Sequence, residues 1–414
     1  MADSVAPSPS AASRTPPSRP AAKPPRGGRW TGALLALGSL AVSLVVAEIA
    51  LRILRPLPDP YAVYKQMPEV SWPGSAYVPS AYPPYFAGTR RAEPGLPGMD
   101  TVPRRFSHNS LGYRGDSLAI PKPPGEVRVF MVGGSTTECV FLDDREAVTA
   151  RLQAYLRQAL PGVDVRVYGA GKSGDRSWDH VAMVGHRIAH LQPDAIVVFA
   201  GINDVMAGVA GRDYLMGAGG PRRPMPREMM LKLALSELHL GRLVHAALAR
   251  HAPQRMTATS GYREAARHAA TLPPRPLPRR PDPTPYAENL ASLAGIARAQ
   301  GARMVLMTQA TTWNTDDARL RGWHWMVGIE ARYPEPDLDA VMNRYNRAML
   351  GVGAAQRVPV FDLAAALPKS ADFFYDDVHF NIRGADTAAR LLARFMVEEG
   401  VVSRPAAPTP PLPR

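Results

Sequence analysis

Short apolar runs and longer helical patterns alternate over the C-terminal two thirds of the chain. The runs typical of buried strands cover residues 127–132, 163–168, 194–200, 302–308 and 358–363. Apolar residues recur at helical spacing over residues 145–160, 177–191, 286–300, 338–356 and 382–399. Because parallel neighbours need a crossover between them, this alternation predicts an α/β domain over residues 126–400, with a parallel sheet covered on both faces.

A continuous apolar segment near the N-terminus predicts a transmembrane helix over residues 30–54. Residues 30–47 are all apolar or small, and the apolar character continues beyond Glu48. About 20 such residues cross the hydrocarbon core of a bilayer as a helix. Basic side chains come before this segment, at Arg14, Arg19, Lys23, Arg26 and Arg29. We therefore expect a signal anchor with a cytoplasmic N-terminus and an exported remainder; a cleaved signal peptide and a buried core helix are the alternatives.

The other segments have little regular patterning. Residues 1–29 and 401–414 are rich in Pro and predict disordered tails, and residues 55–125 predict an extracytoplasmic linker and lead-in. The long stretch between the third and fourth strands predicts an insertion at about residues 207–285, either a cap beside the active site or a docking element for a partner. Within it, helical spacing covers residues 226–250, whereas residues 251–285 look irregular.

The 414-residue chain has a formal net charge of +13, which raises the question of nucleic-acid binding. However, Arg and Pro concentrate in residues 18–29 and 273–285, and no basic face interleaved with aromatic residues is present. The charge therefore favours a solvated surface or attraction to anionic lipid over a nucleic-acid partner. Cys139 is the single cysteine, so no intramolecular disulfide can form; a small buried residue is favoured over a thiol nucleophile.

Four short blocks each follow a predicted strand, where open α/β sheets bind their ligands. They contain Ser135 in residues 133–137, Gly174 in 169–174, Asn203 in 201–204, and the pair Asp376 and His379. A serine, a backbone N–H, an asparagine and an Asp-x-x-His are the parts of a serine acyl hydrolase. The serine lacks a surrounding Gly-x-Ser-x-Gly, which disfavours the ordinary α/β-hydrolase.

Structural interpretations compete with these functional ones. Ser135 also fits a helix capping box with Glu138. Asn203 either donates to an oxyanion or closes an Asx turn, and Asp204 is expected to be structural or a cap.

In the last block, Asp376 can orient His379 toward Ser135, with Asp377 as a competitor for that role; a solvent-facing loop histidine is the alternative. A separate aromatic group, between the fourth and fifth predicted strands, is expected either to line a substrate cleft or to pack under the cap: Trp313, Trp323, His324 and Trp325.

Two other motifs suggest ligands that the rest of their pattern does not support. Residues 171–173 read Gly-Lys-Ser, but Arg166 stands where a phosphate-binding loop needs glycine. A tight turn that presents the N–H of Gly174 is favoured instead. His186 and His190 have helical i, i+4 spacing without a third ligand, so we expect no metal site.

Taken together and in this order, the four blocks resemble those of the SGNH hydrolases, also called GDSL-type esterases, over about residues 105–400. Ser135 in Gly-Gly-Ser-Thr-Thr matches the first block, Gly174 the second, Asn203 the third, and Asp376 with His379 the last. Residues 109–115 are similar to the lead-in of membrane-anchored, bacterial-type members. The sequence departs from the pattern at Gly134, where the family name implies Asp.

The resemblance implies a flavodoxin-like three-layer α/β/α sandwich with a five-stranded parallel sheet. It implies that Ser135 is the nucleophile, that His379 is the general base and then acid, and that Asp376 orients His379. The oxyanion hole would consist of the backbone N–H groups of Ser135 and Gly174 with the Asn203 side chain. The reaction would pass through an acyl-serine and would use no metal or organic cofactor.

The sequence thus predicts a membrane-anchored, extracytoplasmic serine ester hydrolase. Its substrate is expected to be a small acyl ester, such as an acetyl group on a carbohydrate or envelope polymer. One alternative is an O-acyltransferase with the same Ser-His-Asp site. The other is a binding or assembly protein that keeps the fold without turnover.

Overall fold

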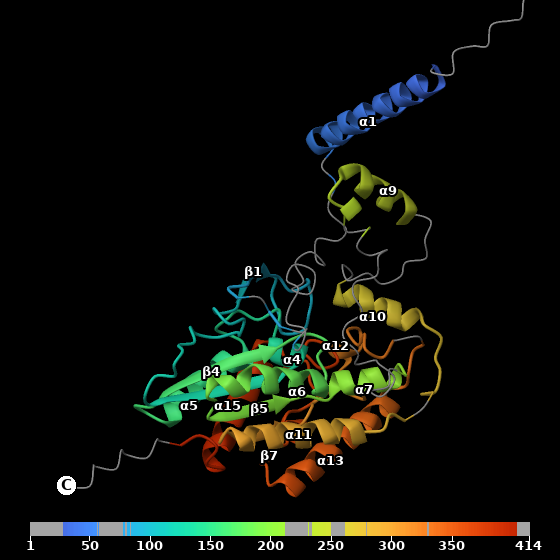
Figure 1. Ribbon diagram of the computed structural model, residues 1–414. Helices are drawn as coiled ribbons and strands as arrows, with labels where there is room; N and C mark the ends of the chain where they lie inside the picture. Colours follow the sequence, from blue (N-terminus) through green and yellow to red (C-terminus); the bar gives the residue numbers. More distant parts are fainter. Residues whose placement is uncertain are drawn as a thin grey trace, which may run out of the picture.

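The computed structural model describes residues 28–55, 57, 78, 81–82, 84–211, 231, 234–249, 261–278, 280–328 and 331–403. Its centre is a five-stranded parallel sheet in the order β4-β3-β5-β6-β7 (Figure 1). The strands are β3 (Glu126–Gly133), β4 (Asp164–Gly171), β5 (Ala195–Phe199), β6 (Arg303–Met307) and β7 (Val360–Phe361). The predicted five-stranded parallel α/β fold is confirmed, although the edge strand β7 is shorter than the apolar run that predicted it.

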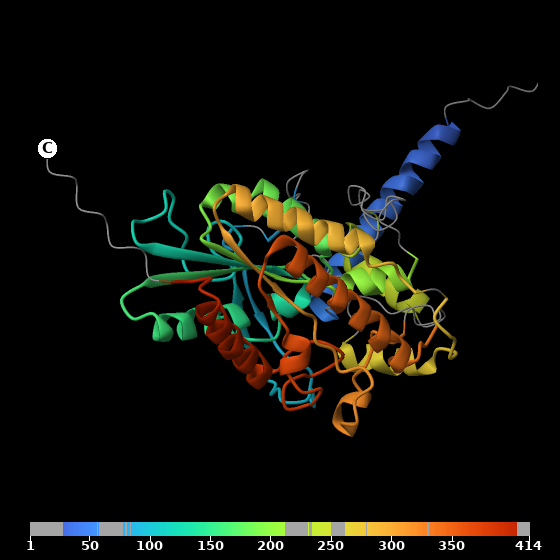
Figure 2. The same ribbon diagram turned by 90° about the horizontal axis from the view of Figure 1, so that it is seen from below.

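Helices cover both faces of the sheet and give three layers (Figure 2). One face packs against α6 (Ser177–His186), α11 (Thr284–Ala299) and α13 (Glu335–Gln356), and the other against α5 (Val148–Ala159) and α15 (Ile382–Glu398). All eight residues of β3 are buried: Phe130 and Val132 belong to the first core, Val129 and Met131 to the second. Because helices cover both faces of the sheet, this strand is apolar at successive positions rather than at every second one.

Several helices are absent from the sequence prediction. They are α7 (Ile202–Val209), α10 (Tyr262–Thr271), α12 (Ala318–Arg321) and α14 (Leu363–Ala366). The short helix η1 (Ile188–Leu191) lies within the predicted helical range 177–191, and α4 (Ser135–Glu138) starts at the serine for which a capping box was considered. The irregular reading of residues 251–285 was wrong for α10, whose buried face consists of the alanines Ala265, Ala266 and Ala269. Small residues of this kind produce only a weak apolar signal. Within residues 226–250 the structure has α9 (His239–Ala249), and much of the stretch before it lies outside the described residues.

The lead-in before β3 has more structure than its Pro-rich sequence indicated. It contains an antiparallel pair, β1 (Ala87–Arg90) and β2 (Arg104–Ser107). Further on, the Arg114 backbone makes two hydrogen bonds with Gly169 of the edge strand β4, at 2.9 and 2.7 Å. The Arg114 guanidinium donates to the carbonyls of Glu138, Cys139 and Leu142 at 2.5–2.9 Å. The lead-in therefore supports the chain that follows Ser135.

The apolar N-terminal segment forms α1 (Gly28–Leu54), which lies apart from the sheet domain (Figure 1). Its span Gly32–Leu54 has 23 residues and no burial within the protein, a length and composition that suit either a membrane anchor or a signal sequence. The end of α1 contacts α9.

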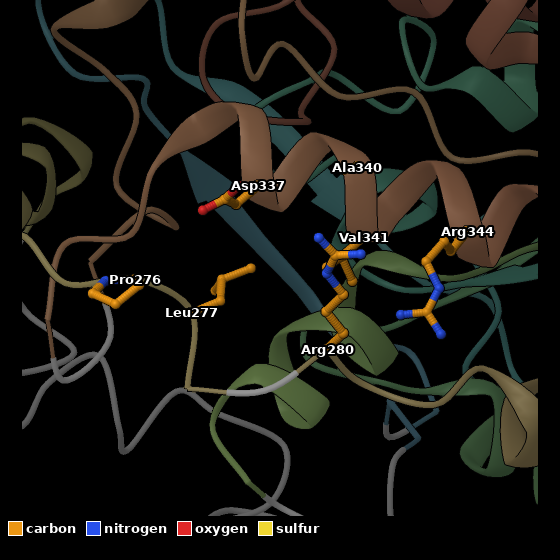
Figure 3. Close-up of a pocket in the computed structure, with 7 residues that line it drawn as sticks. All are labelled: Pro276, Leu277, Arg280, Asp337, Ala340, Val341 and Arg344. Atoms are coloured by element: carbon orange, nitrogen blue, oxygen red, sulfur yellow. The ribbon is translucent and has the colours of Figure 1, made fainter.

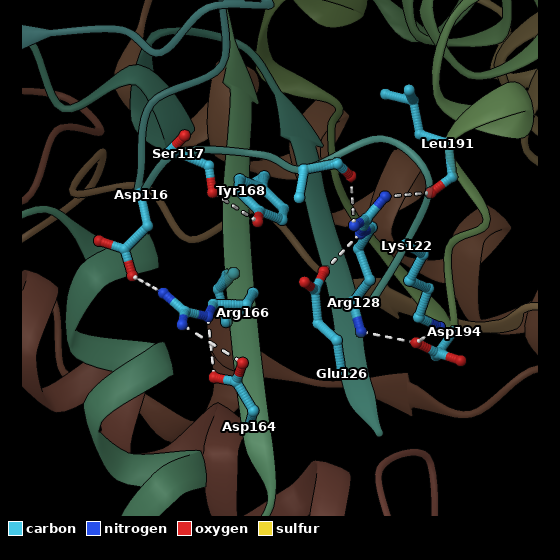
Figure 4. Close-up of polar contacts among 12 residues, drawn as sticks. Asp116, Ser117, Lys122, Glu126, Arg128, Asp164, Arg166, Tyr168, Leu191 and Asp194 are labelled. Atoms are coloured by element: carbon cyan, nitrogen blue, oxygen red, sulfur yellow. Dashed lines mark hydrogen bonds and ion pairs between the residues drawn. The ribbon is translucent and has the colours of Figure 1, made fainter. Parts of the chain in front are cut away.

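A buried arginine organises the amino end of the sheet (Figure 4). Arg128 of β3 pairs with Glu126 at 2.6 Å and donates to the carbonyls of Leu191 and Ala119 at 2.8 and 3.0 Å. Arg166 of the neighbouring β4 also lies in an ion-pair cluster, with Asp116 and Asp164, but that cluster is exposed to solvent.

We expect Arg128→Ala to lower the free energy of unfolding by about 3–5 kcal/mol, because it leaves the buried Glu126 carboxylate without its partner and removes the donor to two carbonyls. Arg166→Ala is the matched control, and its exposed pairs should contribute no more than about 1 kcal/mol. Urea unfolding of the purified protein measures both values. Equal destabilisation by the two substitutions would contradict the distinction.

Candidate active site

The first block places its serine at the carboxyl end of β3, as the first residue of α4. The Ser135 hydroxyl does not cap this helix: its Oγ lies 2.7 Å from Nε2 of His379. Glu138 does not complete a capping box either, because its carboxylate hydrogen-bonds to the hydroxyls of Tyr82 and Ser173. The capping interpretation of Ser135 is therefore wrong.

The last block completes a chain of hydrogen bonds from Ser135. Nδ1 of His379 lies 2.7 Å from Oδ2 of Asp376, and its Nε2 faces the serine. An ionised carboxylate only accepts, so Nδ1 carries the proton and Nε2 accepts from the serine hydroxyl. Asp376 and His379 are buried, so the solvent-facing alternative for this histidine is also wrong.

The protonation states of this pair depend on each other. Burial disfavours the charged imidazolium, but the charge and hydrogen bond of Asp376 outweigh that effect and raise the pKa of His379. Burial likewise disfavours the Asp376 carboxylate, but its interaction with His379 and two backbone N–H groups lowers its pKa. Asp376 therefore remains the negative partner of the histidine.

The neighbouring Asp377 has different partners. Its carboxylate accepts from the Trp313 indole at 2.7 Å and from the backbone N–H groups of Trp325 and Met326 at 2.8 and 3.2 Å. Burial raises its pKa to about 6. Asp377 thus anchors the segment around residues 313–326 rather than contacting the His379 ring.

Trp325 reaches the Ser-His-Asp chain directly, which the sequence analysis left open. Its indole Nε1 donates to Oδ2 of Asp376 at 3.1 Å. In the described structure the other residues of the group do not bond to the Ser-His-Asp chain: the buried His324 hydrogen-bonds to Thr312 at 2.9 Å and to Glu335 at 3.0 Å. Trp313 is fully buried against Asp377, and the Trp323 ring packs on the guanidinium of Arg263, from α10, at 4.8 Å.

The second and third blocks meet beside Ser135. Asn203 donates through Nδ2 to the carbonyl of Asp175 at 2.8 Å, so its amide joins two strand ends rather than closing an Asx turn. A Cβ at Gly134 would lie 2.6 Å from this Nδ2, which puts the amide against the backbone just before Ser135. Gly174 has a φ of +84°, a conformation that favours glycine.

Asp204 has the structural role expected of it. It is fully buried and accepts from the backbone N–H and the hydroxyl of Ser177, the latter at 2.6 Å. These bonds join the first turn of α7 to the start of α6.

Aromatic rings enclose His379. Tyr375 stacks on the imidazole with a centroid separation of 5.4 Å, and Tyr262 meets it edge-on at 5.8 Å. Tyr262 is the first residue of α10, so part of the predicted insertion lies at the site. Neither tyrosine was predicted to lie at the site. Tyr262 lies on a helix that the sequence did not predict, whereas Tyr375 directly precedes the Asp-x-x-His block, and that position was a usable signal.

Other candidate groups lie elsewhere or are inert. Cys139 is buried, and burial raises the pKa of its thiol. Among the described residues, no group of three or more His, Cys, Asp or Glu side chains is arranged to hold a metal ion. A cavity of about 220 Å³ beside α13 is lined by Pro276, Leu277, Arg280, Asp337, Ala340, Val341 and Arg344 (Figure 3). It shares no residue with the Ser-His-Asp chain.

The sequence profile of the GDSL-like Lipase/Acylhydrolase family matches residues 131–387, which include all four blocks. The chain belongs to this family. It is accordingly an ester-bond hydrolase of the SGNH type. No curated protein matches the chain significantly.

Solved structures that resemble this chain over part of its length include LAE5, an alpha/beta hydrolase enzyme from the metagenome of Lake Arreo, Spain. It is 17% identical, with 67% of this chain and 96% of that chain covered and a TM-score of 0.38. The acetyl xylan esterase AlAXEase is 14% identical, with coverage of 65% and 99% and a TM-score of 0.38. Axe2, an acetylxylan esterase from Geobacillus stearothermophilus, is 18% identical, with coverage of 65% and 93% and a TM-score of 0.37.

We expect Trp325→Phe to raise the pKa of His379 further, because the Asp376 carboxylate loses a hydrogen-bond donor and holds the imidazolium more strongly. Titration of the histidine ring by NMR measures the shift. Trp323→Phe changes a neighbouring indole without a bond to Asp376 and serves as the control. An unchanged or lowered pKa in Trp325→Phe would contradict this role.

Proposed function

We propose that this hydrolase cleaves its ester through an acyl-serine formed on Ser135. The observation that carries the proposal is the continuous chain of short hydrogen bonds from Ser135 through His379 to Asp376, at 2.7 Å each. The mechanism needs a serine hydroxyl, an ionised carboxylate on Asp376, and an imidazole on His379 that is neutral above its raised pKa.

In the first half of the reaction, His379 Nε2 takes the hydroxyl proton as Ser135 Oγ attacks the ester carbonyl carbon. The tetrahedral intermediate collapses, the acyl–oxygen bond breaks, and His379 gives its proton to the leaving alcohol. In the second half, His379 takes a proton from water as the water oxygen attacks the acyl-serine carbonyl. The second tetrahedral intermediate collapses, the bond between the acyl carbon and Ser135 Oγ breaks, and His379 returns the proton to Oγ as the acid leaves. Asp376 keeps the imidazole in the required tautomer and stabilises it while it is charged.

The negative oxygen of each tetrahedral intermediate needs hydrogen-bond donors beside Ser135. We assign this role to the backbone N–H groups of Ser135 and Gly174 and to Nδ2 of Asn203. The location of Ser135 at the start of α4, the turn at Gly174 and the Asn203 amide beside Gly134 support the assignment. Losing one such donor typically lowers the rate by about 10²–10³.

The proposed substrate is a small acyl ester, such as an acetyl group on an extracytoplasmic carbohydrate or envelope polymer. The rings of Tyr262 and Tyr375, which pack against the His379 imidazole, support a small acyl group, because they occupy space beside the reacting groups. The outer location follows from α1 as a signal anchor, with the basic residues before it on the cytoplasmic side.

A second candidate reaction is transfer of the acyl group from Ser135 to a sugar hydroxyl. The near-complete burial of Ser135 and His379 favours it, because excluding water gives a bound alcohol the advantage in the second half-reaction. An added glycan acceptor should then become acylated at the expense of hydrolysis.

We expect Ser135→Ala to abolish turnover of p-nitrophenyl acetate, with residual activity at least about 10³-fold below that of the wild type. Ser173→Ala, which changes the nearby hydroxyl bonded to Glu138, is the matched control and should retain most activity. Acetate should be cleaved faster than butyrate or octanoate. Equal turnover by the wild type and Ser135→Ala would overturn the assignment of the nucleophile.

We expect kcat/KM to rise with pH and to reach half its maximum above pH 6.5, the ordinary pKa of histidine. The sign follows from the mechanism: only neutral His379 accepts the serine proton, and Asp376 raises the pKa above which the imidazole is neutral. A pH–rate profile on p-nitrophenyl acetate measures this midpoint. A midpoint below 6.5 would contradict the role given to Asp376.

A further inference from the structure

The insertion helix α9 is fastened to the end of α1 by a carboxylate. The Oε1 and Oε2 atoms of Glu48 accept from the backbone N–H groups of His239 and Leu240, each at 2.9 Å. These N–H groups belong to the first turn of α9, where a helix has free donors and a partial positive charge. The one acidic residue within the long apolar segment thus serves as the cap of a helix about 190 positions later in the chain.

Two arginines strengthen the same junction. Arg52, one turn beyond Glu48, pairs with it at 2.7 Å and donates to the carbonyl of Glu237 at 3.1 Å. Arg242 of α9 donates to the carbonyl of Leu57 at 2.8 Å, so the junction is bonded from both sides. Figure 1 shows α9 beside the end of α1 that leads into the catalytic domain.

The length of α1 sets where this junction lies relative to a bilayer. Residues 30–47 rise about 27 Å as a helix, close to the roughly 30 Å of a hydrocarbon core. Glu48 and Arg52 therefore come at the boundary between hydrocarbon and headgroups. Because α9 is bonded to Glu48 directly, its first turn lies at the same depth.

Several aliphatic side chains of this region are exposed in the part of the chain that the structure describes. Exposed aliphatic side chains lie on α9 and the turn before it: Leu235, Leu238, Leu243 and Val244. α1, which contacts α9, also has exposed apolar side chains near Glu48, among them Leu44, Val45 and Ile49. An apolar surface continuous with a membrane helix, at headgroup depth, matches the outer leaflet of a bilayer.

We propose that α9 and the turn before it form a membrane-interface element, defined by residues 234–249, that lies in the headgroup layer and is held there by Glu48. The proposal rests on α1 being the membrane anchor. The element belongs to the same insertion as α10, whose Tyr262 covers His379.

The test uses the full chain in vesicles of phosphatidylcholine and phosphatidylglycerol. Leu243→Cys carries a polarity-sensitive fluorophore, and Leu350→Cys on α13 is the matched control, since both leucines are helical and 39% exposed. We expect blue-shifted emission at position 243, quenching by lipids with a nitroxide near the headgroup, and several-fold weaker quenching by aqueous iodide than at position 350. The wild-type chain, whose single Cys139 is buried, measures background labelling.

Equal iodide quenching at the two positions in vesicle-bound protein would overturn the proposal. Efficient disulfide cross-linking between Leu243→Cys chains would overturn it in favour of a second copy as the covering partner. If the chain does not float with the vesicles, α1 is not a membrane anchor, and the proposal that rests on it fails. None of these results touches ester hydrolysis, which Ser135→Ala tests separately.

A second variant tests the junction itself. Glu48→Ala removes the cap, so we expect flotation to persist while iodide quenching of the label on position 243 increases several-fold. Glu48→Gln keeps one acceptor oxygen, so the iodide quenching measured in this variant should be intermediate between that with Glu48 and that with Glu48→Ala. If iodide quenches the label on position 243 equally in Glu48→Ala and in the parent protein, Glu48 does not hold the element in place.

Discussion

The buried carboxylate of Asp376 is the group on which the geometry of the site depends. A charge without solvent contact is costly unless hydrogen bonds satisfy it. Here the donors are the backbone N–H groups of Val378 and His379, the imidazole ring and the Trp325 indole. The same contacts that make this charge tolerable also hold the histidine toward Ser135. The hydrogen bonds that stabilise this loop are therefore the same ones that align His379 with Ser135.

The parallel sheet supplies the second constraint, because it brings distant residues to one edge. Gly133 pairs in register with both Gly171 and Phe199, so three strands end at the same level. Gly171 has no room for a side chain: a Cβ there would lie 2.6 Å from the backbone of Thr137. Close approach of β4 to the turn after Ser135 is thus possible only with glycine, and it sets the second block against the first.

Carboxylates from the N-terminal part of the chain cap two helices of the insertion. Glu93 of the lead-in accepts from the backbone N–H groups of Tyr262 and Arg263 at the start of α10, and Glu48 does the same for α9. Each cap joins segments more than 160 positions apart in the chain. The position of Tyr262 over His379 therefore depends on the lead-in as well as on the sheet.

The sequence by itself determined the strand order in the chain, the long helices and the residues of all four blocks. Apolar periodicity indicates which face of an element is buried, and strand-end motifs are short and continuous in the chain. Both can therefore be recognised without knowledge of the tertiary structure. It left open whether Ser135 caps α4 or faces His379, and it missed α10 and the bond from Trp325 to Asp376. Only the tertiary structure decided these points. The partners of Ser135 and Trp325 lie in segments far apart in the chain, whose meeting leaves no local pattern in either, and the buried face of α10 consists of alanines, whose apolar signal is weak.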